Sequence, residues 1–550
     1  MPRTPDFDLL MRALRMVRRA QGAPRPPTVP SVSRRDFLRL SAAAAAAVTI
    51  PGCLNGEGNG GASENRGVAI IGGGLAGLHC AHRLNQLGIG SRIFEARPRI
   101  GGRILTDRSF PGGQHAERGA EFFATGHHTM RDLAQELGID LLDFNQDSPG
   151  LRDLTAFING RTLSNAEIVD GLAPIALAVS RSLDTLQDQN DLFVYFDKPN
   201  GGEALDALSL AAWFDREGIA GSVRELLEVA YTVEFGLDPD ICNCLNFLLR
   251  VADEPAADFD LYGGHDRRFR AADGNDRFTE RLADGLQSGQ VIYSSPLLRV
   301  REGEDGGYTL TFQRRRLTTA LTASHVVLAL PFSTLREIDF GVALPSAKRR
   351  AILELGYGQN TKLLAGFDNR PWRELGSDGT TISDLPYQSG WDASRRQAGE
   401  EGILAGYTGG TRAVLAGRGT SEAALEEFLD DIERVFPGAR AESNGTAARQ
   451  SWDGDPWVKG SRATYRVGQY TALAGAEFDR VGNLHFCGEH TSLDFQGTME
   501  GAALTGGAVA EAIAEDLGVN TGAAVPAGPA QRIMARARAM RQYRRLALAR

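Results

Sequence analysis

The clearest hydrophobic pattern in the chain predicts a strand, a helix and a second strand in close succession. Val68–Ile71 form an apolar, mostly β-branched run that is typical of a buried parallel strand. Apolar residues then recur at near-helical spacing over Leu75–Leu87, and Gly88 stands where a helix should end. A short second strand is predicted over Ser91–Glu95. This succession is typical of an α/β fold with a parallel sheet.

Farther along the chain, the pattern changes from helices to short strands and back. Amphipathic helices without a glycine motif are predicted at 166–186, 208–216 and 223–231, a region that we interpret as an inserted helical substrate domain. Further helices are predicted at 129–137, at 420–436 and in a small-residue stretch ending near 517. Strands are predicted at 291–293, 297–300, 308–312, 325–330 and 361–367. The first three of these strands suit a meander.

Glycines occupy the first, third and sixth positions of the turn between the first strand and the first helix. Gly72 permits the tight turn, Gly74 lets backbone N–H groups approach a pyrophosphate, and Gly77 lets the helix close on the strand. The N-terminus of the helix would then face the phosphates. Glu95 follows the glycines by about twenty residues, where an acid binds ribose hydroxyls. The strand, the helix and the acid together predict a dinucleotide site.

The first 53 residues have the pattern of an export signal. A basic segment containing Arg34-Arg35-Asp36-Phe37-Leu38 precedes an alanine-rich stretch that is too short to span a bilayer. The paired arginines resemble the twin-arginine signal, whose export machinery carries folded proteins and would deliver this one to the periplasm or cell surface. An ordinary alanine-rich helix is the alternative. Ile50-Pro51-Gly52-Cys53 also resembles a lipoprotein site, in which a lipid on Cys53 would attach the protein to the membrane. Residues 54–66 are predicted to be a flexible linker.

Composition narrows the class of protein. The 550 residues, 42% of them hydrophobic, suffice for two or three globular domains. A formal charge of −9 argues against nucleic acid as a partner. Five scattered cysteines do not make a disulfide framework, and no His or Cys cluster indicates a metal site. Residues 518–550 form a basic tail that could dock on anionic lipid, although a solvated terminus is the simpler interpretation.

Several further motifs, in their order along the chain, resemble the flavin-containing amine oxidase family, which includes monoamine, polyamine and L-amino acid oxidases. Besides the glycine turn with Glu95, the motifs are Arg99-Ile100-Gly101-Gly102-Arg103, Asp273-Gly274-Asn275, Leu330-Pro331, Thr361-Lys362, Gly488-Glu489-His490-Thr491 and Met499-Glu500-Gly501-Ala502. The resemblance covers about residues 67–517 and implies FAD as the cofactor. It implies an α/β fold with a Rossmann-like FAD-binding lobe built from three chain segments. A mixed α+β substrate lobe with an inserted helical region would complete the molecule.

The resemblance also implies how the chain divides. The FAD-binding segments would be 67–150, 271–340 and 451–517. The helical substrate domain would span 151–270, and a second substrate segment would span 341–450.

Individual residues take roles from the same resemblance. The predicted cofactor contacts are Gly72, Gly74, Leu75, Ala76, Gly77, Glu95, Ala96, Arg97, Gly102, Arg103, Leu297, Gly488, Glu489, Thr498 and Met499. Glu95 would bind the adenosine ribose, Leu297 would flank the adenine, and Glu489 would contact the ribityl or phosphate region. Lys362 matches the family lysine that holds a water at flavin N5, and it is the predicted catalytic residue.

Departures from the family pattern change the expectation. Ser461 stands where monoamine oxidases have the cysteine that attaches FAD, so we predict dissociable FAD. Arg462 and Thr498 stand where those enzymes place two aromatic walls, so both are predicted to bind substrate instead. Trp452 and Trp457 also lie near this face, where packing is the simpler role for both. Glu121, an acid expected near the entrance, would favour a cationic substrate such as a diamine or polyamine.

The resemblance implies oxidative deamination of a primary or secondary amine. Hydride would pass to flavin N5, water would hydrolyse the imine, and O2 would reoxidise the flavin to give hydrogen peroxide. One alternative is an L-amino acid oxidase in which Arg462 clasps the carboxylate, although Arg462 could instead form a salt bridge between the lobes. Another is a flavin dehydrogenase or desaturase of the same fold. The last is a non-catalytic FAD-bearing lipoprotein, against which Lys362 and the phosphate motifs weigh.

Overall fold

The computed structural model describes residues 67–147, 150–189, 191–252, 266–303, 306–314 and 317–519. The predicted export signal, the linker, Cys53 and all but the first two residues of the basic tail lie outside these ranges. Within them, every helix is too short or too polar to span a membrane.

A five-stranded parallel sheet forms the core of the first lobe. Its strand order is β20-β13-β1-β2-β9, so strands from three distant parts of the chain lie side by side. The strands are β1 (Val68–Ile71), β2 (Ser91–Phe94), β9 (Val291–Ile292), β13 (His325–Leu328) and β20 (Leu484–Phe486). In register, Val68 lies opposite Ser91 on one side and His325 on the other. The structure confirms a lobe built from three chain segments.

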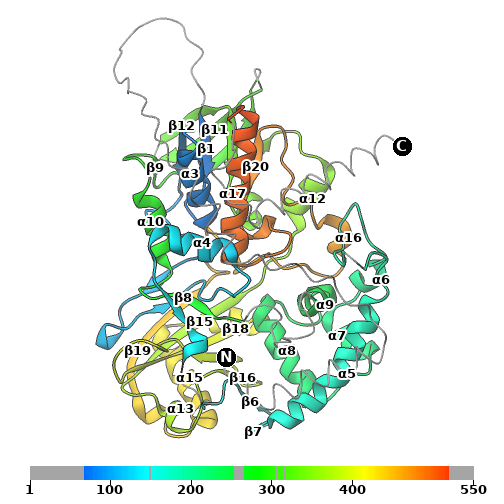
Figure 1. The fold of residues 1–550 in the computed structure, drawn as a ribbon, viewed down its shortest axis with the longest axis vertical. Helices are drawn as coiled ribbons and strands as arrows, with labels where there is room; N and C mark the ends of the chain where they lie inside the picture. The colour runs from blue at the N-terminus through cyan, green and yellow to red at the C-terminus, as the bar shows by residue number, and fades with distance from the viewer. Residues whose placement is uncertain are drawn as a thin grey trace, which may run out of the picture.

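Two helices from opposite ends of the described chain pack against each other beside this sheet. They are α3 (Leu75–Gln86) and α17 (Met499–Asp516), in blue and red in Figure 1. Gly506 permits their close approach, because a Cβ there would overlap the backbone of Ala76. Gly88 follows the C-cap of α3 with φ of +72°, a left-handed conformation that favours glycine. The predicted end of this helix is therefore confirmed. Two further helices of the layer are α4 (His128–Leu137) and α10 (Asp276–Asp284).

A four-stranded sheet with the order β12-β11-β10-β14 packs on the first. The strands are β10 (Leu297–Glu302), β11 (Tyr308–Arg314), β12 (Leu317–Ala323) and β14 (Asp339–Gly341). Phe94 of β2 stacks on Phe312 of β11, with 4.4 Å between ring centroids. Strands β10, β11 and β12 form an antiparallel meander. Strand β9 pairs in parallel with β2, so the prediction that it belongs to the meander is wrong. Strand β12 was not predicted, because its mostly exposed residues give no apolar alternation.

The second lobe is built on a seven-stranded sheet with the order β19-β15-β18-β17-β16-β6-β7. The strands are β6 (Thr155–Ile158), β7 (Arg161–Thr162), β15 (Asn360–Phe367), β16 (Thr381–Ser383), β17 (Ser389–Asp392), β18 (Gly402–Gly409) and β19 (Ser443–Ser451). Strand β15 is buried along its whole length between β18 and β19. Helix α15 (Ser421–Val435) packs on β15 and β19, and Thr420 caps its N-terminus.

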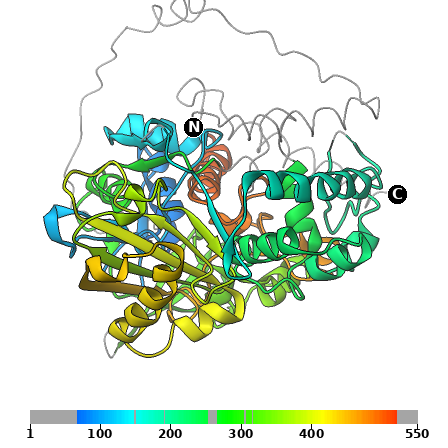
Figure 2. The ribbon, with the colours of Figure 1, turned by 90° about the horizontal axis from the view of Figure 1, so that it is seen from below.

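The inserted helices lie to one side of this sheet. They are α5 (Asn165–Leu183), α7 (Leu210–Arg216), α8 (Ser222–Phe235) and α9 (Cys244–Ala252). Figure 2 shows the teal helices beside the yellow and green strands. A capping box between Ser164 and Glu167 begins α5. The region predicted as helical also contributes β6 and β7, because a four-residue apolar run cannot be told from a buried helix by periodicity.

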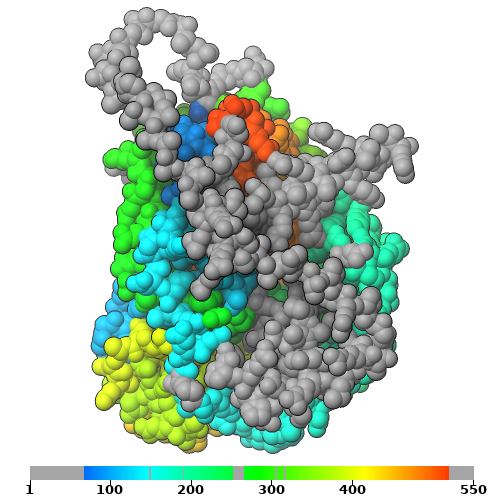
Figure 3. Space-filling model, viewed as in Figure 1, coloured from blue at the N-terminus to red at the C-terminus, as the bar shows by residue number. Residues whose placement is uncertain are grey.

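Short elements complete the two lobes. Two strand pairs are β3 (Thr106–Asp107) with β4 (Ala116–Glu117), and β5 (Leu141–Asp143) with β8 (Phe269–Ala271). The short helices are η1 (Pro111–Gly113), η2 (Phe144–Gln146), α6 (Glu203–Asp206), α11 (Phe332–Leu335), α12 (Ser346–Glu354), α13 (Pro371–Glu374), α14 (Gly410–Ala416), η3 (Arg440–Glu442), α16 (Tyr470–Leu473) and η4 (Glu489–Thr491). The space-filling view shows the blue and red segments of the first lobe together at the top, with the second lobe below (Figure 3).

Candidate functional site

A cavity of about 570 Å³ lies between the two lobes, at the carboxyl ends of β1, β2 and β13. Open parallel sheets bind ligands at this edge, and the volume lies within the range of about 300–1,000 Å³ that is usual for ligand pockets. The wall includes every predicted cofactor contact except Gly77. Gly77 instead packs behind the turn, where a Cβ would overlap the carbonyl oxygen of Gly72. Its predicted role in closing the helix on the strand agrees with this position.

The glycine turn leaves open space at the N-terminus of α3. Gly74 is the N-cap of this helix, and no side chain caps it. A Cβ at Gly74 would meet no atom within 4 Å and would enter the cavity. The first-turn N–H groups of a helix have no partner within the helix, and they attract anions. The turn therefore fits a pyrophosphate.

Glu95 is buried at the end of β2, and backbone N–H groups hold its carboxylate. Oε2 accepts a hydrogen bond from Gly73 N at 2.7 Å, and Oε1 accepts one from Arg97 N at 2.8 Å. Glu95 lines the cavity together with Ala96 and Leu297. Because each carboxylate oxygen has a second lone pair, both can still accept from ribose hydroxyls.

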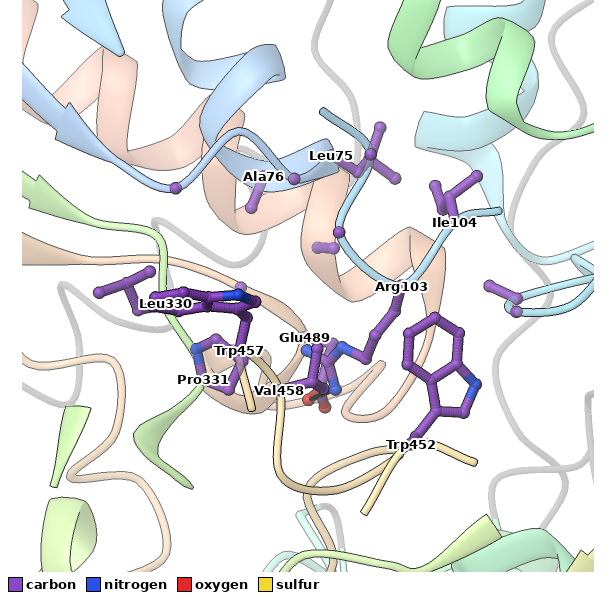
Figure 4. A pocket seen from close by; sticks show the side chains of 18 of the residues that line it. Leu75, Ala76, Arg103, Ile104, Leu330, Pro331, Trp452, Trp457, Val458 and Glu489 are labelled. Atoms are coloured by element: carbon purple, nitrogen blue, oxygen red, sulfur yellow. Dashed lines mark hydrogen bonds and ion pairs between the residues drawn. The ribbon is translucent and has the colours of Figure 1, made fainter. Parts of the chain in front are cut away.

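An ion pair joins the first and third segments of the cofactor lobe across the cavity wall. Arg103 Nη1 donates to Glu489 Oε1 at 2.7 Å and to Ser461 O at 2.9 Å. Glu489 also accepts from Gly497 N at 2.9 Å. Burial alone would raise the pKa of Glu489, but Arg103 holds it below its usual value, so the pair is ionised. Figure 4 shows the two side chains pointing toward each other.

Two tryptophans flank that ion pair in Figure 4. Trp452 is buried, whereas 43% of Trp457 is exposed, and both line the cavity. Ser461, which stands in the place of the family cysteine, also lines the cavity. Its hydroxyl lies 2.6 Å from Asn360 Oδ1 and 3.0 Å from Gly358 O, so it is held within the protein.

Lys362 lies near the start of β15, and only 3% of it is exposed. Its Nζ lies 2.9 Å from Glu117 O, 3.0 Å from Gly119 O and 2.9 Å from Glu121 Oε2. An ammonium group has three N–H donors, so these three acceptors can use all of them. Nζ also lies 5.1 Å from the ring centroid of Trp391. The cation is thus fixed at the cavity wall from several directions.

Glu121 is buried, which corrects the expectation that it stands at the entrance. Its Oε1 accepts from Arg270 Nη1 at 3.2 Å and from Trp391 Nε1 at 3.0 Å, while Lys362 binds Oε2. Burial alone would raise the pKa of Glu121, but Lys362 and Arg270 hold it below its usual value. Because both cations already compensate this charge, Glu121 offers little attraction for a cationic substrate. Arg270 was not predicted from the sequence, where its one signal is an arginine within the short strand β8.

Arg462 is bound to Glu234 of helix α8. Its Nη1 donates to Glu234 O at 2.6 Å and to Glu234 Oε1 at 3.0 Å, which is the salt bridge between lobes that the sequence left open. Thr498 is the N-cap of α17, where its Oγ1 accepts from Gly501 N at 3.1 Å and lies 2.8 Å from Phe495 O. Arg462 and Thr498 both line the cavity, so the structure brings all the predicted substrate-binding residues to one wall.

Glu117 next to Lys362 should make the stability of the protein depend on pH. Burial raises the pKa of Glu117 from its usual 4.5 to about 7. The folded chain therefore binds this proton more tightly than the unfolded chain, and the stability it contributes is lost as the pH rises from about 4.5 to about 7. We expect Glu117→Gln to remove this slope and to gain up to about 3 kcal/mol over the wild type between pH 4.5 and pH 8, measured by urea unfolding. The control Glu203→Gln, at an exposed site, should leave the slope of unfolding free energy against pH unchanged. The same unchanged slope in Glu117→Gln would contradict the prediction.

A family model described as "Flavin containing amine oxidoreductase" matches residues 75–514 of this chain. A second model, for the twin-arginine translocation pathway signal sequence, matches residues 31–51 and indicates export across the membrane.

Individual proteins and solved structures are similar over most of the same region. The L-amino-acid oxidase of Siganus canaliculatus is 26% identical over 437 residues, which is 77% of this chain and 81% of that protein. Polyamine oxidase 4 of Oryza sativa subsp. japonica is 24% identical over 454 residues, covering 81% of this chain and 88% of the relative. The solved structure of cyclohexylamine oxidase from Brevibacterium oxydans IH-35A has a TM-score of 0.72 and 25% identity. That match covers 82% of this chain and 100% of the other.

Proposed function

Because this chain belongs to the flavin-containing amine oxidoreductase family, we propose that it is an FAD-dependent amine oxidase acting on a primary or secondary amine. For a primary amine, the amine, O2 and water give a carbonyl compound, ammonia and hydrogen peroxide. Bound FAD would supply the two-electron acceptor for this oxidation and the reactivity with O2. The observation that carries the proposal is one cavity whose wall includes both the glycine turn and Lys362.

The residues that would hold FAD come from all three segments of the cofactor lobe. The turn at Gly74 and the guanidinium of Arg103 would bind the pyrophosphate, and Glu95 would bind the ribose. Thr498 and Met499, at the N-terminus of α17, would lie at the flavin ring. The positive end of that helix favours negative charge on a neighbouring group.

Lys362 is the proposed catalytic residue. Since three protein acceptors can use its three donors, a water beside the flavin would bind Lys362 only by replacing one of them. The carbonyl oxygen of Gly119, at 3.0 Å, is the farthest of the three. The cation also disfavours a protonated amine nearby, so it would help to keep the substrate amine in its neutral, reactive form.

Aromatic side chains make up much of the wall near Lys362. Trp391 and Tyr407 lie with their ring centroids 5.6 Å apart, and Phe122 meets Trp391 edge to face. Burial raises the pKa of Tyr407 to about 12, so its hydroxyl stays neutral. This wall would exclude water from the reacting carbon and pack against an apolar part of the substrate.

An L-amino acid oxidase is the second candidate, because Arg462 lies on the cavity wall. A dehydrogenase or desaturase of the same fold is the third, and it would reduce bound FAD without consuming O2. Purified protein assayed for peroxide with amines and amino acids, together with anaerobic flavin absorbance, separates these functions. The amine oxidase proposal fails if FAD binds but no amine or amino acid bleaches it.

The site of action is proposed to be the periplasm or the cell surface, reached through the twin-arginine machinery. The pattern Ile50-Pro51-Gly52-Cys53 supports a lipid anchor on Cys53. Mass spectrometry of the mature N-terminus tests this, since an anchored chain would begin at an acylated Cys53 and a cleaved one would not.

We expect FAD to be bound without a covalent link. Ser461 replaces the family cysteine, and a hydroxyl is a far weaker nucleophile than a thiolate. Acid precipitation of the FAD-loaded protein should therefore release all of the flavin into the supernatant, measured by its absorbance. Ser461→Ala should release it equally. Flavin that stays with the wild-type pellet would contradict the prediction.

A further inference from the structure

Three arginines converge on one carboxylate at the second-lobe side of the cavity. Arg250 Nη2 lies 2.7 Å and Arg462 Nη1 lies 3.0 Å from Glu234 Oε1, and Arg267 Nη2 lies 3.5 Å from Glu234 Oε2. Burial alone would raise the pKa of Glu234, but the three guanidinium groups hold it at about 2, so the carboxylate is ionised. We call these four residues the arginine cluster.

The arginine cluster borders two cavities. Glu234, Arg267 and Arg462 line the large cavity, whose wall also includes Lys362. Arg250 and Arg462 line a second cavity of about 100 Å³. The cluster is therefore a polar part of the same wall that is aromatic near Lys362.

The charges in this wall favour an anion. Among the described residues of the arginine cluster, three guanidinium groups surround one carboxylate. The neighbouring group of Lys362, Arg270 and Glu121 also has more cations than carboxylates. Only 11–26% of each side chain in the cluster is exposed, so solvent and salt screen these charges less than at the surface. An additional ammonium group here would be repelled.

We infer, on the basis of the proposed function, that the substrate is an amine that also carries a carboxylate, and that the arginine cluster is the subsite for that carboxylate. Arg267 and Arg462 would bind it, since both line the large cavity and a guanidinium presents a planar fork of donors that matches a carboxylate. Arg250 and Glu234 position these two side chains. The amine end would lie toward Lys362 and the aromatic wall.

This subsite differs from both expectations drawn from the sequence. A diamine or polyamine would bring a second ammonium group to a cationic wall, and the acid that favoured it, Glu121, is already paired. A clasp by Arg462 alone would use a guanidinium that Glu234 already engages through two acceptor atoms. The contact between Arg267 Nη2 and Glu234 Oε2, at 3.5 Å, is the longest in the cluster.

Binding can be tested without turnover. FAD-loaded full-length protein is titrated with benzoate and with benzamide, which has the same shape without the charge, and binding is followed by the flavin difference spectrum. A charge-assisted hydrogen bond to the carboxylate should make benzoate bind about tenfold to a hundredfold more tightly than benzamide. Equal affinities would overturn the subsite.

Two adjacent arginines provide a matched pair of variants. Arg268 pairs with Asp143 outside the cavity wall, whereas Arg267 lines it. Arg267→Met should weaken benzoate about tenfold or more and leave benzamide unchanged, while Arg268→Met removes the same charge one residue away and should change neither. Arg267→Lys keeps the charge but loses the planar fork, so its affinity for benzoate should lie between those of the wild type and Arg267→Met. Identical behaviour of the Arg267 and Arg268 variants would overturn the assignment. The comparison of benzoate with benzamide uses the wild-type protein, so it tests the subsite even if a variant fails to fold.

Substrates distinguish the position of the carboxylate and separate the two proposals. Anaerobic flavin reduction is compared for three compounds. Phenylalanine carries an α-carboxylate, 4-aminobutanoate carries a distant carboxylate, and phenethylamine carries none. We expect phenylalanine or 4-aminobutanoate to reduce the flavin at a concentration about tenfold lower than phenethylamine requires. If phenethylamine reduces the flavin best, the subsite is wrong and the proposed oxidase stands. If no compound reduces it while benzoate still binds more tightly than benzamide, the subsite stands and the oxidase does not.

Discussion

Gly74→Ala should weaken FAD binding strongly while leaving the fold intact. Gly74 has φ of −79° and ψ of 179°, which alanine adopts without strain, and its Cβ would meet no protein atom within 4 Å. The added methyl group would enter the cavity where backbone N–H groups face the proposed pyrophosphate. Losing one such charge-assisted hydrogen bond weakens binding by about tenfold to a hundredfold. Titration of apoprotein with FAD, followed by tryptophan fluorescence, measures the change, because Trp452 and Trp457 line the same cavity.

Two other glycines serve as controls for this substitution. Gly90 also has no atom within 4 Å of an added Cβ, but it lies away from the cavity wall, so Gly90→Ala should bind FAD normally. Gly77→Ala should instead damage the fold, since its Cβ would overlap the backbone of Gly72. If Gly74→Ala binds FAD as tightly as Gly90→Ala, the phosphates do not lie at this turn.

The cofactor lobe was predictable because its signals are local. The buried run of β1, the spacing of apolar residues in α3 and the left-handed Gly88 each lie within one short stretch of sequence. The same holds for the glycine turn and Glu95, which end adjacent parallel strands and must therefore lie at one edge of the sheet. Gly77 lies behind the turn, in agreement with its predicted role of letting the helix close on the strand.

The buried polar contacts around the cavity were not predictable in the same way. Glu121, Arg270 and Lys362 are far apart in the sequence; Arg270 lies in β8, Lys362 lies in β15, and Glu121 lies outside the named strands. Periodicity does not encode such contacts, so the sequence placed Glu121 near the entrance of the site instead. The arginine cluster is a similar case, since Glu234 and Arg462 come from different lobes. What the sequence did supply was the identity of Lys362 and Arg462, through the family motifs around them.

Lys362→Met should both slow turnover and destabilise the protein. The substitution leaves Glu121 with one cation fewer and removes a donor from the carbonyl oxygens of Glu117 and Gly119. Removing one partner of a buried ion pair costs about 3–5 kcal/mol, whereas a surface pair contributes at most about 1 kcal/mol. Lys459→Met, which breaks the more exposed pair with Glu337, is the matched control and should change the unfolding free energy little.

The pH dependence identifies the cause of the destabilisation. Lys362 lowers the pKa of Glu121 below its usual 4.5, so the stability from this pair is present above that pH and is lost as the pH falls. The difference in unfolding free energy between wild type and Lys362→Met should therefore shrink as the pH falls below about 4.5. Adding Glu121→Gln should cost further stability, because Arg270 still pairs with Glu121 in the single variant and would lose its carboxylate. Unchanged flavin kinetics in Lys362→Met would remove the catalytic assignment of Lys362.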